Sequence, residues 1–241
     1  MSASVSYLSR ADIEQIAKPI ITEYKHRYVP QHHMCYRVDP AELASLLGFK
    51  VEYTSLSKDG TILGQTASVP LWTTTVDPVA GEIYYFLDGK TILIEKRLQS
   101  IPRIAGRKNF TIAHELAHLT INKLYPEMYE PQFRIFCDYR KTNQKKSIRN
   151  WYEWQADTLA SALLLPPDAI EEAMFIFGLG NNMKVLSRKY SQRRYEQFCE
   201  MAQFLGVSKT TLAYRMEHLG LLERNYLVKE AQQKRGVVCY G

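Results

Sequence analysis

The spacing of apolar residues changes along the chain and predicts both helices and strands. Over residues 9–27 they recur every three or four positions, which predicts an amphipathic helix with Ser9 as its N-cap. A short helix is expected at residues 40–48, ending at Gly48. Residues 50–100 alternate as strands do, between turn residues. We expect strands at 51–56, 63–68, 71–76, 82–86 and 90–98, with a further strand-like patch at 133–136.

The two residues Asp88-Gly89 suggest how two of these strands connect. They separate residues 82–86 from Thr91–Glu95, and an Asp-Gly pair between two strand-like runs favours a tight β-hairpin. The sequence therefore predicts that these two runs pair with each other.

Two later segments are apolar on most sides, which predicts buried helices. In residues 110–119 the apolar positions surround most of the helix, and Asn109 or Thr111 is a suitable cap. The second helix spans residues 150–165 and ends before Pro166-Pro167, because proline cannot continue the hydrogen-bond ladder.

The C-terminal part reads as a separate helical element. Asp168-Ala169-Ile170-Glu171 predicts a capping box that starts a helix ending at Gly178. The glycine- and asparagine-rich residues 178–182 are the best candidate boundary. We therefore predict two domains, at residues 1–178 and 183–241.

Composition restricts the class of protein. Of the 241 residues, 46% are hydrophobic and 23% charged, which is typical of a globular protein and argues against wholesale disorder. The net charge of +6 favours an anionic partner only weakly. The N-terminus lacks the pattern of a signal peptide, and no apolar run approaches the length of a membrane span. We expect a soluble, cytoplasmic protein without a membrane partner.

The candidate chemistry lies in His114-Glu115-Leu116-Ala117-His118. On a helix the two imidazoles fall on one face, one turn apart, where both can ligate one metal ion. Glu115 points about 100° away around the axis, beside such an ion, as a general base requires. The alternative is a pair of core histidines without a metal.

A catalytic zinc site needs a third protein ligand. Glu153 and Asp157 lie four residues apart on the second buried helix, so they share one face. Glu153 is the candidate ligand, and Asp157 is expected to orient a ligand imidazole. A buried salt bridge of these acids to Arg149 or Lys145 is the alternative.

The two motifs together resemble the ImmA/IrrE metallo-endopeptidases. The residues that carry the resemblance are Phe110–His118 and the pattern of Glu153, Ala156, Asp157, Ala160 and Leu163–Pro166, with a weaker likeness at Asp39–Val51. Leu159, Leu165 and Ala117 depart mildly from the family pattern without removing a ligand.

The resemblance implies an α+β, zincin-like metalloprotease core: a small mixed sheet, the HExxH helix and a second ligand helix. It also implies one Zn²⁺ per chain on His114, His118 and Glu153, with Glu115 as the general base. The implied substrate is a partner repressor, which such enzymes cleave to relieve repression of mobile elements or stress genes. Zinc peptidases often add the substrate as a strand near this helix, and Thr91–Glu95 is our candidate; an ordinary sheet strand is the alternative.

Residues 195–222 resemble a helix-turn-helix, with Ser208 capping the second helix. In a DNA-binding role the side chains facing the groove would be those of Lys209, Thr210, Thr211 and Arg215. DNA is thus a possible but not favoured partner, because a similar helix pair recurs in the peptidase family, where it resembles a structural or partner-docking element as much as a DNA reader. The rival hypotheses to a peptidase are a DNA-binding regulator with a vestigial zinc site and a module that only sequesters a repressor.

Overall fold

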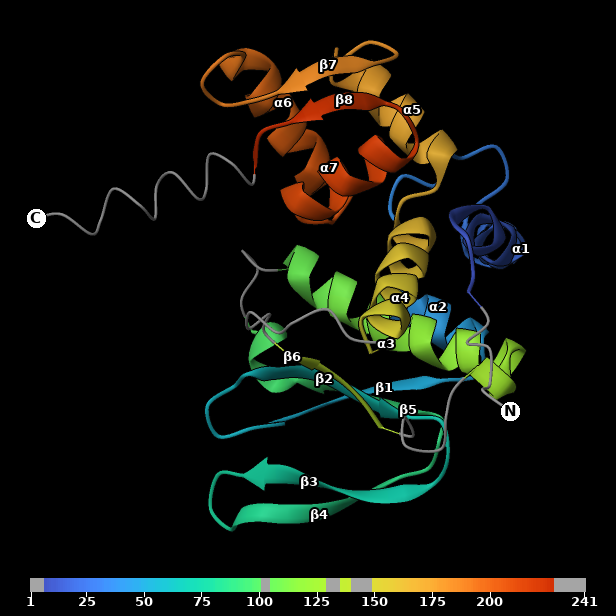
Figure 1. The fold of residues 1–241 in the computed structure, drawn as a ribbon, viewed down its shortest axis with the longest axis vertical. Helices are drawn as coiled ribbons and strands as arrows, with labels where there is room; N and C mark the ends of the chain where they lie inside the picture. Colours follow the sequence, from blue (N-terminus) through green and yellow to red (C-terminus); the bar gives the residue numbers. More distant parts are fainter. Residues whose placement is uncertain (1–6, 101–104, 129–134, 140–148, 228–241) are drawn as a thin grey trace, which may run out of the picture. The chain divides into compact units, whose positions relative to one another are not determined.

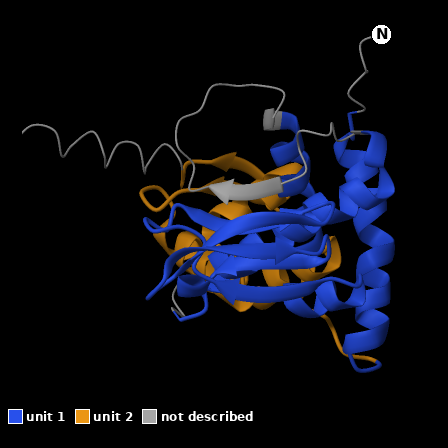
Figure 2. Cartoon of the chain, turned by 90° about the horizontal axis from the view of Figure 1, so that it is seen from below, with its two compact units in different colours: residues 1–31, 39–164 blue, residues 32–38, 165–241 orange. Residues whose placement is uncertain are grey.

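The computed structural model describes residues 7–100, 105–128, 135–139 and 149–227. Within these ranges the chain forms an α+β structure with seven α-helices and three small sheets. Two compact units are distinguished: residues 1–31 with 39–164, and residues 32–38 with 165–241 (Figure 2). The sequence predicted two domains divided at residues 178–183. Compact units are not the same as domains that fold independently, so this division stays a prediction.

The first unit is built on a four-stranded mixed sheet in the order β1-β5-β2-β6. Strand β5 pairs in parallel with β1 and antiparallel with β2, and β2 pairs antiparallel with β6. Every residue of β5 is buried, which fits a central strand covered on both faces. The strands are β1 (Lys50–Thr54), β5 (Thr91–Glu95), β2 (Ile62–Ala67) and β6 (Ile135–Tyr139).

The predicted β-hairpin at Asp88-Gly89 is wrong. Strand β4 (Gly81–Leu87) pairs with β3 (Leu71–Asp77) in a separate two-stranded sheet, while β5 belongs to the large sheet. The Asp88 carboxylate accepts hydrogen bonds from the Lys90 N–H and the Thr91 hydroxyl, both at 2.8 Å. This local turn carries the chain from one sheet to the other, a destination that turn residues alone do not specify.

The proposal that Thr91–Glu95 receives the substrate as an added strand is also wrong. Both edges of this strand are already occupied, by β1 on one side and β2 on the other. Strand addition needs an unpaired edge. The alternative reading, an ordinary sheet member, is confirmed.

Four helices complete the first unit. Helix α3 (Ala105–Leu124) packs against β2 and β5 on one side and against α4 (Arg149–Leu164) on another (Figure 1). Helix α1 (Arg10–Tyr28) packs on α4, and its capping box at Ser9 confirms the predicted start. Helix α2 (Pro40–Leu46) and the short 3₁₀ turns η1 (Lys96–Leu98) and η3 (Pro126–Met128) lie between these elements in sequence.

The helix α3 begins earlier in the chain than the sequence analysis predicted. The helix is already formed at Ala105, so Asn109 and Thr111 are interior positions and not caps. Both side chains are buried, at 5% and 1% exposure. The end of α4 at Leu164, before the two prolines, agrees with the prediction.

The described part of the second unit contains three helices and a two-stranded parallel sheet. Helix α5 (Pro167–Ile176) begins with a proline in its first turn, and its N-cap Pro166 makes no side-chain hydrogen bond. The predicted capping box at Asp168 is therefore wrong, because proline supplies the helix start instead. The remaining elements are β7 (Met183–Leu186), α6 (Gln192–Phe204), α7 (Lys209–His218) and β8 (Leu222–Asn225).

No helix among the described residues is long and apolar enough to cross a membrane.

Candidate metal centre

The two histidines of α3 face each other one turn apart in the core. Their Nε2 atoms are 3.1 Å apart, and the ring planes are nearly perpendicular. The exposed fractions are 3% for His114 and 1% for His118. The pair therefore presents two nitrogen donors to one point, as the i, i+4 spacing predicted.

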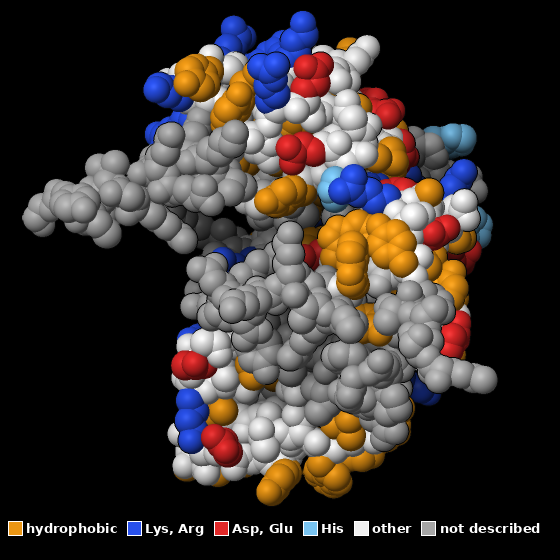
Figure 3. All heavy atoms as spheres, viewed as in Figure 1, with side chains coloured by type: hydrophobic (Ala, Val, Ile, Leu, Met, Phe, Trp, Pro, Cys, Tyr) orange, Lys and Arg blue, Asp and Glu red, His pale blue; other side chains and the backbone are white. Residues whose placement is uncertain are grey.

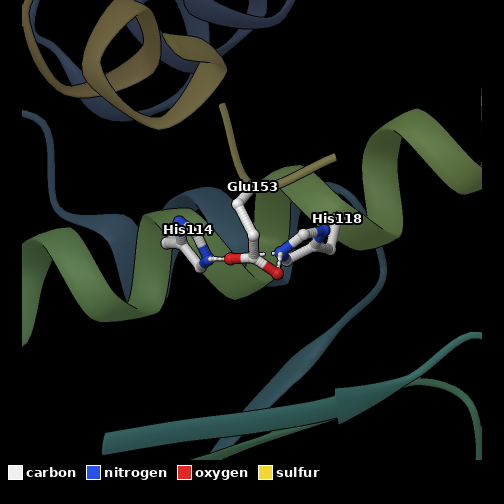
Figure 4. Close-up of side chains that lie close together, drawn as sticks. All are labelled: His114, His118 and Glu153. Carbon is white, nitrogen blue, oxygen red and sulfur yellow. Dashed lines mark hydrogen bonds and ion pairs between the residues drawn. The ribbon is translucent and has the colours of Figure 1, made fainter. Parts of the chain in front are cut away.

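Helix α4 brings Glu153 to the same point. One carboxylate oxygen lies 3.2 Å from the Nε2 of His114, and the other lies 3.7 Å from the Nε2 of His118 (Figure 4). The ligand atoms of the three residues all lie within 4.8 Å of one another. The convergence depends on the packing of α3 against α4, since Glu153 is 39 residues from His114 in the chain.

These distances suit a tetrahedral metal ion. Ligand atoms about 2.0–2.1 Å from an ion are about 3.3 Å apart at tetrahedral angles. The separation of 3.1 Å between the two Nε2 atoms and that of 3.2 Å from His114 to the nearer Glu153 oxygen are close to that value. Two imidazoles and one carboxylate are also a donor set of catalytic zinc. The residues present therefore fit a divalent transition-metal ion.

Asp157 contacts the ring nitrogen of His114 that faces away from Glu153. Its carboxylate oxygen is 3.0 Å from the Nδ1 of His114. An ionised Asp157 accepts a hydrogen bond from Nδ1–H, which leaves the Nε2 lone pair directed at the metal position. The interaction predicted for Asp157 is thus geometrically in place.

The ionisation of His114, His118 and Glu153 reflects their mutual contacts. Burial disfavours the charged form of His114, but the carboxylates of Asp157 and Glu153 outweigh it and raise the pKa of His114 well above its usual range. Burial lowers the pKa of His118. The pKa of Glu153 is lowered, because hydrogen bonds from both imidazoles outweigh the opposing effect of burial. A cation at this point would compete with protons for His114.

Glu153 and Asp157 lie against the histidines of α3, as given above. The alternative, a salt bridge of these acids to Arg149 or Lys145, stays a prediction, because Lys145 and the side chain of Arg149 lie outside the described residues.

Glu115 lies beside the pair and is completely buried. It faces β2 at Gly64: a Cβ placed on Gly64 would be 2.7 Å from a Glu115 carboxylate oxygen and 2.7 Å from a Thr111 methyl group. Gly64 therefore leaves the space that this carboxylate occupies. Sequence reasoning missed Gly64, although a glycine inside a strand often marks a close approach.

The four residues proposed to contact nucleic acid belong to the second unit and behave differently. Ser208 caps α7 through a 3.1 Å bond from the Thr211 N–H, as predicted. Lys209 and Thr210 are exposed, and Thr211 is half-buried. Arg215 is only 1% exposed and donates a hydrogen bond from Nε to the Leu165 carbonyl oxygen at 3.1 Å. The assignment of Arg215 to a DNA-facing surface is therefore corrected: its guanidinium is an internal group.

Comparison with known proteins bears on this geometry. A family model described as the IrrE N-terminal-like domain, Peptidase_M78, matches residues 75–217. The match covers more than half of the chain and includes both helices that supply the three donors. No curated protein matches the chain.

Proposed function

The chain belongs to the Peptidase_M78 metallopeptidase family, with its IrrE N-terminal-like domain, and we propose that it is a zinc-dependent endopeptidase that cleaves a partner repressor protein. The observation that carries the proposal is the convergence of His114, His118 and Glu153 from α3 and α4. The family match includes both helices, and the distances show that their side chains meet at one point.

Zinc is the metal that we propose for this centre. His114, His118 and Glu153 would hold it, and three protein ligands leave one position open, as catalytic zinc sites require. When bound, the ion supplies Lewis acidity, which polarises a scissile carbonyl and makes water nucleophilic at neutral pH. Two buried imidazoles with one carboxylate suit zinc better than magnesium or calcium, which prefer oxygen ligands.

Glu115 is the proposed general base. It neighbours His114 on α3 and its charge acts on the His114 imidazole, but it is not one of the three converging residues. In this role it takes the proton of the attacking water and then gives a proton to the leaving amine. Asp157 fixes the tautomer of His114 through the 3.0 Å contact at Nδ1.

The proposed substrate is a helix-turn-helix repressor, and its cleavage would relieve transcriptional repression. This part rests on the resemblance of the two motifs to the ImmA/IrrE enzymes, whose members act on repressors of mobile elements or stress genes. A cytoplasmic location follows from that role and is part of the same proposal.

The test compares the wild-type chain with Glu115→Gln. Metal analysis should find about one zinc per chain in both proteins, because Glu115 is not a ligand. Incubation with repressors encoded beside the gene, followed by mass analysis of fragments, should show cleavage by the wild type alone. A chain without affinity for zinc would refute the proposal. Derepression by Glu115→Gln in cells, equal to that by the wild type, would instead favour sequestration of the repressor.

A further inference from the structure

The second unit carries a dense group of basic residues that the proposed peptidase does not use. Residues 183–195 contain no Asp or Glu. Figure 3 shows Lys and Arg side chains gathered over the part of the molecule that Figure 1 labels β7 and α6. The exposed basic residues of this segment are Lys184, Arg188, Lys189, Arg193 and Arg194.

A hydrogen-bonded turn holds two of them at the start of α6. The Ser187 hydroxyl accepts bonds from the N–H groups of Lys189 and Tyr190, both at 3.2 Å. The Ser191 N–H donates to the Ser187 carbonyl oxygen at 3.2 Å. The turn therefore fixes the backbone that carries Arg188 and Lys189.

Lys209 of α7 joins the same surface. Its ammonium group donates a 2.9 Å hydrogen bond to the hydroxyl of Tyr195, which lies in the first turns of α6. Arg188 lies close enough to repel this ammonium electrostatically. We name the exposed group Arg188, Lys189, Arg193, Arg194 and Lys209 the basic face.

Three of the five cations of the basic face are not neutralised by a described ion pair. Among the described residues, no ion pair within 4.0 Å involves Lys189, Arg193 or Arg194. The nearest acid along α6, Glu196, accepts a 3.0 Å hydrogen bond from Gln192. Clustered like charges repel one another, so such a surface gains free energy from an anionic partner.

We propose that the basic face binds the phosphate backbone of duplex DNA, independently of base sequence. Three of its five members are arginine, whose planar fork suits phosphate oxygens. DNA offers closely spaced charges that can meet several of these side chains at once. Sequence-independent contact also agrees with the burial of Arg215, since that side chain cannot read a base edge.

Two triple variants of the full chain test the proposal. Lys189→Ala/Arg193→Ala/Arg194→Ala changes the basic face, and Lys18→Ala/Lys90→Ala/Lys96→Ala removes three exposed lysines of the first unit. Both variants lower the net charge of +6 by three, to +3. Binding to a fluorescent DNA duplex is measured by anisotropy at several salt concentrations, with circular dichroism to verify folding.

Salt dependence gives the expected sizes. Five phosphate contacts predict that affinity falls about 500-fold between about 50 and 200 mM salt, whereas two contacts predict about 10-fold. The wild type and the first-unit variant should show the steep dependence, and the basic-face variant the shallow one. Absent binding at low salt, or an equal loss in both variants, would overturn the proposal. Equally effective competition by poly-glutamate would also overturn it, in favour of an acidic protein partner.

Discussion

Two helix pairs in this molecule bury polar side chains with opposite consequences. In the pair α3 and α4, the imidazoles of His114 and His118 meet a carboxylate from the facing helix. In the pair α6 and α7, the buried Arg215 donates to a backbone carbonyl, and the other cations lie outside. Burial alone therefore does not mark a reactive site. Convergence of several donors on one point does, because only that arrangement can hold an ion.

The largest effect should come from Glu153→Ala. The variant removes one of the three proposed ligands, so metal affinity and peptidase activity should fall well beyond the roughly 10–100-fold expected for an outer-shell loss. Bound zinc is measured after dialysis, together with turnover of the identified substrate. Glu171→Ala, at an exposed acid of α5, is the matched control. Normal metal content in Glu153→Ala would show that the side chains of α3 and α4 do not hold a metal ion together.

A smaller loss of activity is expected from Gly64→Ala. The new methyl group would displace the Glu115 carboxylate, and misplacing a catalytic group by about 1 Å costs on the order of 100-fold in rate. Zinc content should not change. In the Glu115→Gln background the same substitution should have no further effect on turnover, because the group it displaces is no longer a base. Additive losses would assign Gly64 to folding alone.

Arg215→Met tests the other helix pair. The change keeps an unbranched side chain but leaves the Leu165 carbonyl oxygen without this hydrogen bond, which should lower the free energy of unfolding by about 1–3 kcal/mol. Chemical denaturation measures the loss. Zinc content and turnover per folded chain should stay at the wild-type level. A loss of metal in this variant would erase the distinction between the two pairs.

The smallest effect on stability is expected at a polar contact outside both helix pairs. It shows how little a partly exposed hydrogen bond contributes. The Tyr85 hydroxyl donates a hydrogen bond to Glu52. Burial and this contact raise the pKa of Tyr85 to about 12. Hydrogen bonds from Lys50 and Tyr85 lower the pKa of Glu52.

The pH dependence of that contact follows from the lowered pKa of Glu52 and the raised pKa of Tyr85. Glu52 contributes stability above the pKa of an unfolded glutamate, about 4.3, which is lost as pH falls through its lowered folded value. Tyr85 contributes stability below about 10, which is lost as pH rises through about 12. Tyr85→Phe should lower the free energy of unfolding by a few tenths of a kcal/mol near neutral pH, because solvent screens the pair. The loss should be smaller at pH 3, because protonation of Glu52 weakens the contact. A cost that stays constant from pH 3 to 7 would contradict this.

Local patterns were sufficient for much of the fold and for naming the three side chains that converge. The i, i+4 spacing placed His114 and His118 on one face, and the same rule paired Glu153 with Asp157. Ser9 and Ser208 were recognised as caps because a cap depends on a side chain and a backbone N–H three residues apart.

Two of the errors concern where a local signal leads in space. Asp88-Gly89 does form a turn, but the strand that follows pairs with β1 and β2, whose residues lie far away in sequence. The pattern of α7 gave no sign that Arg215 points to Leu165, fifty residues earlier in the chain.

By itself, the sequence determined which side chains share a helix face, because helical periodicity needs only a few neighbouring residues. Tertiary structure alone decided that α4 delivers its carboxylate within 3.2 Å of the imidazole of His114 and that Gly64 makes room for Glu115. The physical reason is that packing between distant segments sets these distances, and no local rule contains the identity of the partner segment.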